Sequence, residues 1–108
     1  MIDLSGDFRL DDPEVFQKYY KLEHSAVELQ RKFVYGLTES NREAIAGAQY
    51  IANPGCFATA SALALMPMVK SGLLAGTIIV DAKTGSSGSG AKPAQNTHHP
   101  QRMNSFYA

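Results

Sequence analysis

A single thiol stands at the head of an apolar segment. Cys56 is the only cysteine of the 108-residue chain, and it follows the turn sequence Asn53-Pro54-Gly55 and precedes the helix-forming run FATASALAL. A thiol is nucleophilic as its thiolate, and the unpaired N–H groups and positive dipole end of a helix stabilise that anion. The sequence therefore predicts Cys56 as a catalytic nucleophile in the first turn of a helix. The alternative is a buried structural thiol, because cysteine is among the most buried residue types.

Two further polar side chains stand where a substrate could be bound. Arg9 follows a predicted strand exit, a place where ligands of α/β sheets collect, and its planar guanidinium suits phosphate or carboxylate. The alternative for Arg9 is a surface ion pair with one of the nearby carboxylates, Asp7, Asp11 or Asp12. Asn53 can donate its side-chain amide to an oxyanion, or can simply shape the turn before Pro54.

A glycine-rich segment, TGSSGSGAK, begins at Thr84. It lacks the order G-x-G-x-x-G, and no periodic helix follows it, so it is not a dinucleotide fingerprint. It also lacks the Gly-Lys-Ser/Thr ending of a phosphate-binding loop, and Pro93 opposes a following helix. What remains is a flexible backbone rich in N–H donors that allows close approach of an anionic ligand, or a solvated linker.

The three histidines do not form a metal site. His98 and His99 are adjacent, and His24 stands far from them in the sequence. Neither a second cysteine nor an acidic cluster completes a metal-ligand spacing, so we predict no metal. A histidine could still act as the general base for Cys56, because such partners are close in space rather than in sequence, but no pattern indicates which one.

The elements that must position these residues alternate between strands and helices. We expect strands over Ile2 to Leu4, Gln49 to Ala52 and Thr77 to Val80, the last one buried. We expect a first helix beginning at Pro13 with Asp11 or Asp12 as its cap, a second over Ser25 to Arg31, and a third over Arg42 to Ala46 ended by Gly47. The longest helix should begin at Cys56, be buried on most sides, kink or stop near Leu65 because of Pro67, and end at Gly72.

Composition excludes several classes of protein. The chain is 44% hydrophobic and 19% charged, as is usual for a globular chain, and ten basic residues balance ten acidic ones. No net field favours nucleic acid or an anionic membrane, and no signal peptide or membrane span is recognisable. We therefore expect a soluble, cytoplasmic protein without nucleic-acid or membrane partners. Strand-like patterns at both ends suggest an internal portion of a longer polypeptide.

Four segments in order carry a resemblance to a known family: IDLSGDFRL, FVYGLTESNREAI, IANPGCFATASALALMPMVKSGLL and IIVDAKTGSSGSG. Together they closely resemble the N-acetyl-gamma-glutamyl-phosphate reductases of arginine biosynthesis, within the aspartate-semialdehyde dehydrogenase-like group. The sister activity, a carrier-linked aminoadipyl-phosphate reductase of lysine biosynthesis, is the nearest alternative because HHPQR is similar to that loop. The N-terminal glycine-rich dinucleotide turn and the downstream block with the acid/base histidine are absent from the chain.

The resemblance implies an NADP(H)-dependent reductase that acts on a small-molecule acyl phosphate through a cysteine thioester and is a homo-oligomer at full length. It implies an α/β fragment that spans the end of a Rossmann-type NAD(P)-binding domain, residues 1–55, and the start of an α+β catalytic domain, residues 56–108. Cys56 falls on the family's nucleophile, Arg9 on a position that meets the substrate phosphate, and Asn53 on the turn that presents the thiol. The residues expected beside the nicotinamide are Gly85, Ser86, Ser87 and Gly88.

Two other classes compete with the reductase. A non-catalytic α/β module would keep Cys56 as an inert structural thiol. A hydrolase would pair Cys56 with a histidine and act without a nicotinamide cofactor. As a reductase, the fragment alone is expected to be inactive, because it lacks the dinucleotide turn and the acid/base histidine.

Overall fold

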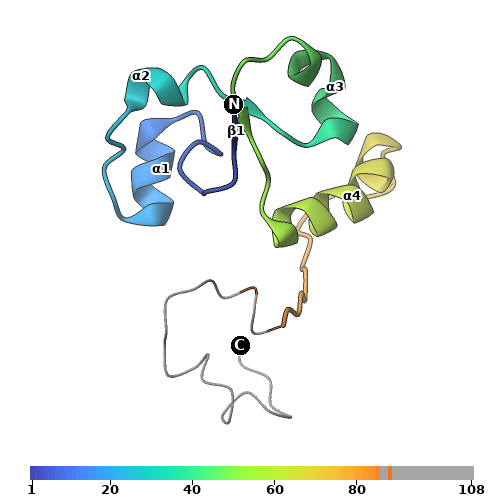
Figure 1. Cartoon of the computed structure of the whole chain (residues 1–108). Helices are drawn as coiled ribbons and strands as arrows, with labels where there is room; N and C mark the ends of the chain where they lie inside the picture. The colour runs from blue at the N-terminus through green and yellow to red at the C-terminus, as the bar shows by residue number, and fades with distance from the viewer. Residues whose placement is uncertain (86–87, 89–108) are drawn as a thin grey trace. The chain divides into compact units, whose positions relative to one another are not determined.

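The computed structural model describes residues 1–85 and 88 of the chain. The described residues fall in two units that divide between Ile78 and Ile79. Every helix and strand found in the described ranges lies in the first unit (Figure 1). In chain order they are β1 (Ile2–Asp3), α1 (Pro13–Tyr20), α2 (Val27–Gln30), β2 (Val34–Tyr35), α3 (Thr38–Ala46), β3 (Ile51–Ala52) and α4 (Cys56–Lys70).

The three short strands form one parallel sheet in the order β1-β3-β2. Ile51 of β3 lies opposite both Ile2 of β1 and Val34 of β2. Parallel strands need crossover connections. Along the chain, helices α1 and α2 connect β1 to β2, and helix α3 connects β2 to β3. The predicted α/β class is confirmed at this level.

A small core lies around β3 and α1. Its buried apolar residues in the described ranges are Phe16, Leu37 and Ala52. An aromatic cluster extends this core, since the rings of Phe8 and Phe33 stack with centroids 4.1 Å apart, and Phe33 contacts Tyr50 at 5.4 Å. These contacts join the loop after β1 to the residues that precede β2 and β3.

The start of α1 follows the predicted capping pattern. Asp12 is the N-cap, and its Oδ1 accepts the backbone N–H groups of Glu14 at 2.8 Å and Val15 at 3.3 Å. Pro13 takes the first helical position, where its missing N–H leaves no bond unmade. Two other helices differ from the prediction, because α2 is limited to Val27–Gln30 and α3 begins at Thr38 instead of Arg42.

Helix α4 begins at Cys56 as predicted, but an early stop near Leu65 and burial on most sides, both expected for it, are wrong. It continues through Pro67 to Lys70, and none of its residues is buried; Phe57, for example, is 44% exposed. The part of the chain that the structure describes does not cover its apolar surface. The predicted cap at Gly72 is confirmed, since Gly72 follows the last helical residue, Lys70, by two positions and has a φ of +73°, and the N–H of Leu73 donates to Met68 O at 3.0 Å, which closes the last turn.

The predicted buried strand over residues 77–80 is not formed. Ile79 is 91% exposed, and no residue from 79 to 85 belongs to a helix or strand. A β-branched run becomes a strand only where another strand pairs with it, and the described ranges offer none at this point. None of the helices within residues 1–85 and 88 is long and apolar enough to cross a membrane.

Candidate active site

The carboxyl ends of two neighbouring strands bring the predicted site residues together. Strand β1 ends at Asp3 and leads into the loop that contains Arg9, while β3 ends at Ala52 and leads into Asn53 and Cys56. Because β1 and β3 pair in parallel, their carboxyl ends lie at the same edge of the sheet. Ligands of open α/β sheets bind outside this edge. The site is therefore built from two loops that are far apart in the sequence.

Cys56 occupies the first position of α4 and is exposed. Gly55 is the N-cap, and no side chain accepts the first N–H groups of the helix, because glycine has none to offer. Those donors and the dipole of the 15-residue helix favour negative charge next to the thiol. The alternative of a thiol packed inside the core does not describe this structure.

The guanidinium of Arg9 connects the two loops. Its Nε donates to the carbonyl of Asn53 at 2.7 Å, and one Nη donates to the carbonyl of Leu4 at 3.1 Å. These two bonds use part of the five N–H groups of the side chain and leave the others available to an anion. The alternative for Arg9, a surface ion pair with Asp7, Asp11 or Asp12, is not formed; the ion pair found among the described residues joins Lys83 to Asp81.

Gly55 makes the close approach of Arg9 possible. A β-carbon at position 55 would lie 3.1 Å from Nη1 of Arg9, which is tighter than most real contacts of that kind. The φ of Gly55 is −74°, a value open to any residue, so the backbone conformation does not require glycine. A side chain there would instead require the Arg9 guanidinium to shift by a few tenths of an ångström. The sequence pattern predicts the turn but not this contact.

Asn53 contributes mainly through its backbone. Its N–H donates to Asp3 O at 2.8 Å, its carbonyl accepts from Arg9, and its side-chain Nδ2 donates to Pro54 O at 3.1 Å. The amide therefore folds back on the turn, as the turn-shaping alternative expected. One Nδ2 hydrogen and Oδ1 are not used in these bonds, so the predicted substrate contact stays a prediction.

The predicted cofactor loop lies in the second unit and is described in part. Gly85 and Gly88 are exposed, and the N–H of Gly88 donates to Gly85 O at 3.1 Å, which closes a turn. A β-carbon on Gly88 would lie 2.6 Å from Oγ1 of Thr84, so the Thr84 side chain would have to shift to admit one. Ser86 and Ser87 lie outside the described residues.

His24 has no nitrogen free for catalysis in this arrangement. The N–H of Ala26 donates to Nδ1 at 3.0 Å, so Nδ1 carries the lone pair, and the protonated Nε2 donates to Asp7 O at 2.9 Å. His98 and His99 lie outside the described residues. No group of three potential metal ligands occurs among the residues that are described.

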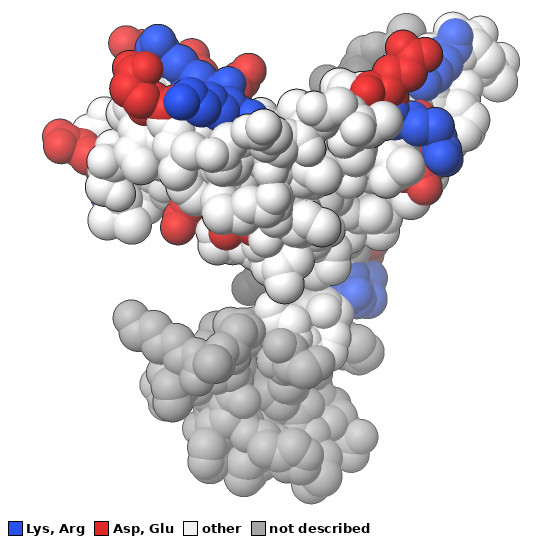
Figure 2. Space-filling model, turned by 45° about the horizontal axis from the view of Figure 1, so that its top comes forward, with Lys and Arg blue, Asp and Glu red and all other residues white. Residues whose placement is uncertain are grey.

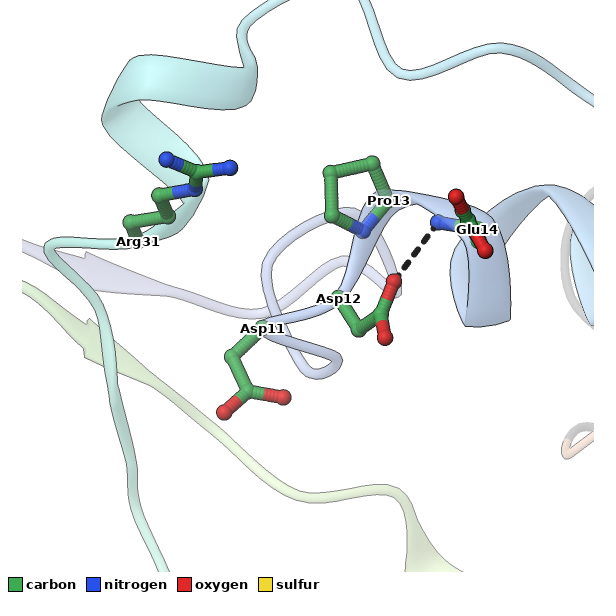
Figure 3. Close-up of a pocket in the computed structure, with 5 residues that line it drawn as sticks. All are labelled: Asp11, Asp12, Pro13, Glu14 and Arg31. Atoms are coloured by element: carbon green, nitrogen blue, oxygen red, sulfur yellow. Dashed lines mark hydrogen bonds between the residues drawn. The ribbon is translucent and has the colours of Figure 1, made fainter.

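The charged hollow at the start of α1 is separate from the predicted site residues. Figure 3 shows its lining, with the Asp12 carboxylate bonded to the N–H of Glu14. Its volume is about 680 Å³, and Asp11, Pro13 and Arg31 complete the lining. Figure 2 shows, on the face that it presents, basic side chains next to acidic ones and no extended patch of one sign.

Comparison with known proteins defines the class of protein to which these loops belong. Residues 56–108 match the family described as "Semialdehyde dehydrogenase, dimerisation domain". The chain is 50% identical over 101 residues to a protein of Methanopyrus kandleri named N-acetyl-gamma-glutamyl-phosphate reductase, covering 94% of the chain and 29% of that relative. It is 49% identical over 108 residues to the reductase of that name from Bacillus mycoides, covering 99% of the chain and 31% of that relative. A Methanocaldococcus jannaschii protein of the same name is 49% identical over 100 residues, covering 93% of the chain and 29% of that relative.

The part of the chain that begins at Cys56 is thus similar to the dimerisation domain of the semialdehyde dehydrogenases. Nearly the whole chain is similar to one segment of the N-acetyl-gamma-glutamyl-phosphate reductases. It spans about three tenths of the length of the curated relatives that it matches.

Proposed function

We propose that the polypeptide containing this chain reduces N-acetyl-gamma-glutamyl phosphate to N-acetylglutamate semialdehyde with release of phosphate, a step of arginine biosynthesis. The names of the relatives support this substrate and reaction type. The observation that carries the proposal is the exposed Cys56 at the first position of α4, beside a turn that Arg9 contacts directly. A thiolate can attack an acyl phosphate, and a cation at the same turn can bind the phosphate group that leaves.

Cys56 is proposed to act as the nucleophile. The thiolate sulfur attacks the acyl carbon, the bond from that carbon to the phosphate oxygen breaks, and phosphate leaves with the electron pair. The product is a thioester on Cys56, which accepts hydride more readily than a carboxylate would. After reduction, the carbon–sulfur bond breaks, the aldehyde forms, and the thiolate is stabilised again by the N–H groups that open α4.

Arg9 and Asn53 are proposed to bind the substrate. The N–H groups of Arg9 that are not bonded to Leu4 or Asn53 can pair with phosphate oxygens, and a guanidinium forms such contacts in a bidentate way. The free amide hydrogen of Asn53 can donate to the developing oxyanion. In this arrangement, one cation both shapes the turn and neutralises the leaving group.

NADP(H) is the proposed cofactor, and its binding would involve Gly85, Ser86, Ser87 and Gly88. NADPH, when bound, supplies the hydride that reduces the thioester. The described part of this loop fits close approach of a ligand, because Gly85 and Gly88 carry no side chains and are both exposed. We further propose that residues 1–55 complete a Rossmann-type domain and that residues 56–108 begin the catalytic domain.

The full-length protein is proposed to be a cytoplasmic homo-oligomer. The matched family is described as a dimerisation domain, which supports self-association. The carrier-linked aminoadipyl-phosphate reductase is less well supported, because the similar proteins reported above are named for the arginine-pathway substrate.

The test is a hybrid reductase in which residues 1–108 replace the aligned segment of the Bacillus mycoides relative. We expect the hybrid reductase to consume NADPH and release phosphate in equal amounts with N-acetyl-gamma-glutamyl phosphate. Cys56→Ala should lower kcat by at least about 1,000-fold, as removal of a covalent nucleophile does. Activity that survives this change, or that proceeds without a nicotinamide cofactor, would refute the proposal. A hydrolase would give the second result.

A further inference from the structure

His24 stands in the connection between α1 and α2, yet its imidazole bonds to the loop that follows β1. Its Nε2 donates to the carbonyl of Asp7 at 2.9 Å, and its Nδ1 accepts the N–H of Ala26 at 3.0 Å. A backbone carbonyl can only accept and a backbone N–H can only donate, so these partners fix the neutral tautomer with hydrogen on Nε2. The ring is thus a bridge between two backbone segments, and it has no nitrogen left for a ligand.

Aromatic packing holds the next residue of the same loop. The ring of Phe8 is stacked on Phe33 at 4.1 Å with an angle of 10° between the planes, and it meets the edge of His24 at 5.3 Å. His24 also packs at 4.8 Å against Phe16, which is buried in the core. The imidazole therefore contacts both α1 and the loop after β1, and it holds the loop in place against the helix.

The backbone of the loop after β1 also lies close to α1, at Gly6. A β-carbon on Gly6 would lie 2.8 Å from Oη of Tyr20, so the loop passes directly against that ring. Arg9 follows Asp7 and Phe8 immediately, and its guanidinium reaches Asn53 O at 2.7 Å and packs on Gly55. The mobility of the Arg9 side chain therefore depends on how firmly the backbone of Asp7 and the ring of Phe8 are held.

We infer that His24 is a positioning residue for Arg9: it clamps the carbonyl of Asp7 and the ring of Phe8, and thereby fixes the guanidinium against the turn that carries Cys56. The inference about geometry stands on the contacts of the described residues alone. Its consequence for substrate binding rests on the function proposed above for Arg9.

The test compares two variants of nearly equal side-chain size, His24→Gln and His24→Met, in the 108-residue chain. Gln offers an amide donor to Asp7 O and Met offers none, while both lose the imidazole ring. The measurement is hydrogen exchange of the Arg9 Nε–H by 15N NMR, with the signal assigned by its loss in Arg9→Lys. We expect exchange about fivefold faster in His24→Met than in His24→Gln, the ratio that one typical hydrogen bond supplies.

Equal exchange in the two variants would overturn the inference. The backbone amides of Ile51 and Asn53, which bond to Met1 O and Asp3 O, report whether the sheet is intact. If His24→Met loses protection at these amides, the same pair is compared in the hybrid reductase, and equal exchange there overturns the inference as well.

Kinetics of the hybrid reductase separate this inference from the proposed function. His24→Met should raise KM for the acyl phosphate about fivefold relative to His24→Gln, with KM for NADPH unchanged. If Arg9 exchange responds but KM does not, the positioning is correct and the proposed role of Arg9 is wrong. If Arg9 exchange does not respond while Cys56→Ala abolishes activity, the proposed function stands and this inference fails.

Discussion

The Nε of Arg9 donates to the carbonyl of Asn53 at 2.7 Å, across 44 positions of the sequence. This bond joins the loop after β1 to the turn that precedes α4, and Gly55 allows the guanidinium to lie against that turn. The same side chain also bonds to Leu4 O at 3.1 Å. Arg9 therefore has a structural role in the turn in addition to the substrate role that we propose.

Arg9→Ala should destabilise the chain because two bonds from a charged donor are lost together. Hydrogen bonds to charged groups contribute about 1.5 to 3 kcal/mol each when well shielded, and the partial exposure of Arg9 lowers this to about 1 to 2 kcal/mol in total. Urea unfolding measures the change. Arg42→Ala is the matched control, since Arg42 is exposed and lies on α3, and it should change the free energy of unfolding by less than about 0.5 kcal/mol. Equal effects of the two changes would contradict the role given to Arg9.

Gly55→Ala and Gly47→Ala should act in opposite directions. Nothing lies within 4 Å of a β-carbon at position 47, where φ is −96°, so Gly47→Ala should stabilise by about 0.4 to 1 kcal/mol through the unfolded state. At position 55 the new carbon meets Arg9 Nη1 at 3.1 Å and must displace the guanidinium. We expect Gly55→Ala to lower the free energy of unfolding in the same urea titration. A gain equal to that of Gly47→Ala would show that Arg9 does not need this space.

Gln30→Glu should make stability depend on pH. Gln30 is fully buried, and its Nε2 donates to Leu10 O at 2.7 Å, while Oε1 has no partner among the described residues. A protonated carboxyl can replace that donor, but an ionised one cannot, and burial penalises its charge. The pKa of the new carboxyl is therefore raised in the folded state above its unfolded value of about 4.3.

The raised pKa determines how the stability of Gln30→Glu depends on pH. A group with a raised folded pKa contributes stability that is present below the unfolded value and is lost as pH rises through the folded value. Thermal unfolding of Gln30→Glu should therefore show a Tm close to that of the original chain near pH 4 and a progressively lower Tm toward pH 8, relative to the original chain at each pH. A difference in Tm that is constant over this range would contradict burial of the carboxyl next to Leu10 O.

The features predicted well from sequence are local. The cap at Asp12, the start of α4 at Cys56 and its end at Gly72 each depend on a few neighbouring residues whose backbone chemistry is specific. The meeting of Arg9 with Asn53 also had a basis in sequence, because both follow strands and the exits of parallel strands share an edge.

The features that sequence missed depend on tertiary contact. Strand β2 spans only Val34–Tyr35, too short to show a period of two, and it exists because β3 pairs with it. The hydrogen bond from His24 to Asp7 O cannot be predicted from a sequence pattern either, since every residue has the same backbone carbonyl. The exposed surface of α4 was predicted to be buried from its composition, which describes the helix but not what lies beside it.

The central claim, that Cys56 forms a thioester with the acyl group of the substrate, has a direct test. The hybrid reductase is mixed with N-acetyl-gamma-glutamyl phosphate without NADPH, quenched with acid and digested, and the peptide containing Cys56 is weighed by mass spectrometry. We predict that this peptide gains the mass of the N-acetylglutamyl group, that later addition of NADPH before the quench removes the gain, and that Cys56→Ser gives no thiol-linked acyl group. An unmodified Cys56 peptide in a hybrid reductase that turns over the same substrate would contradict the claim.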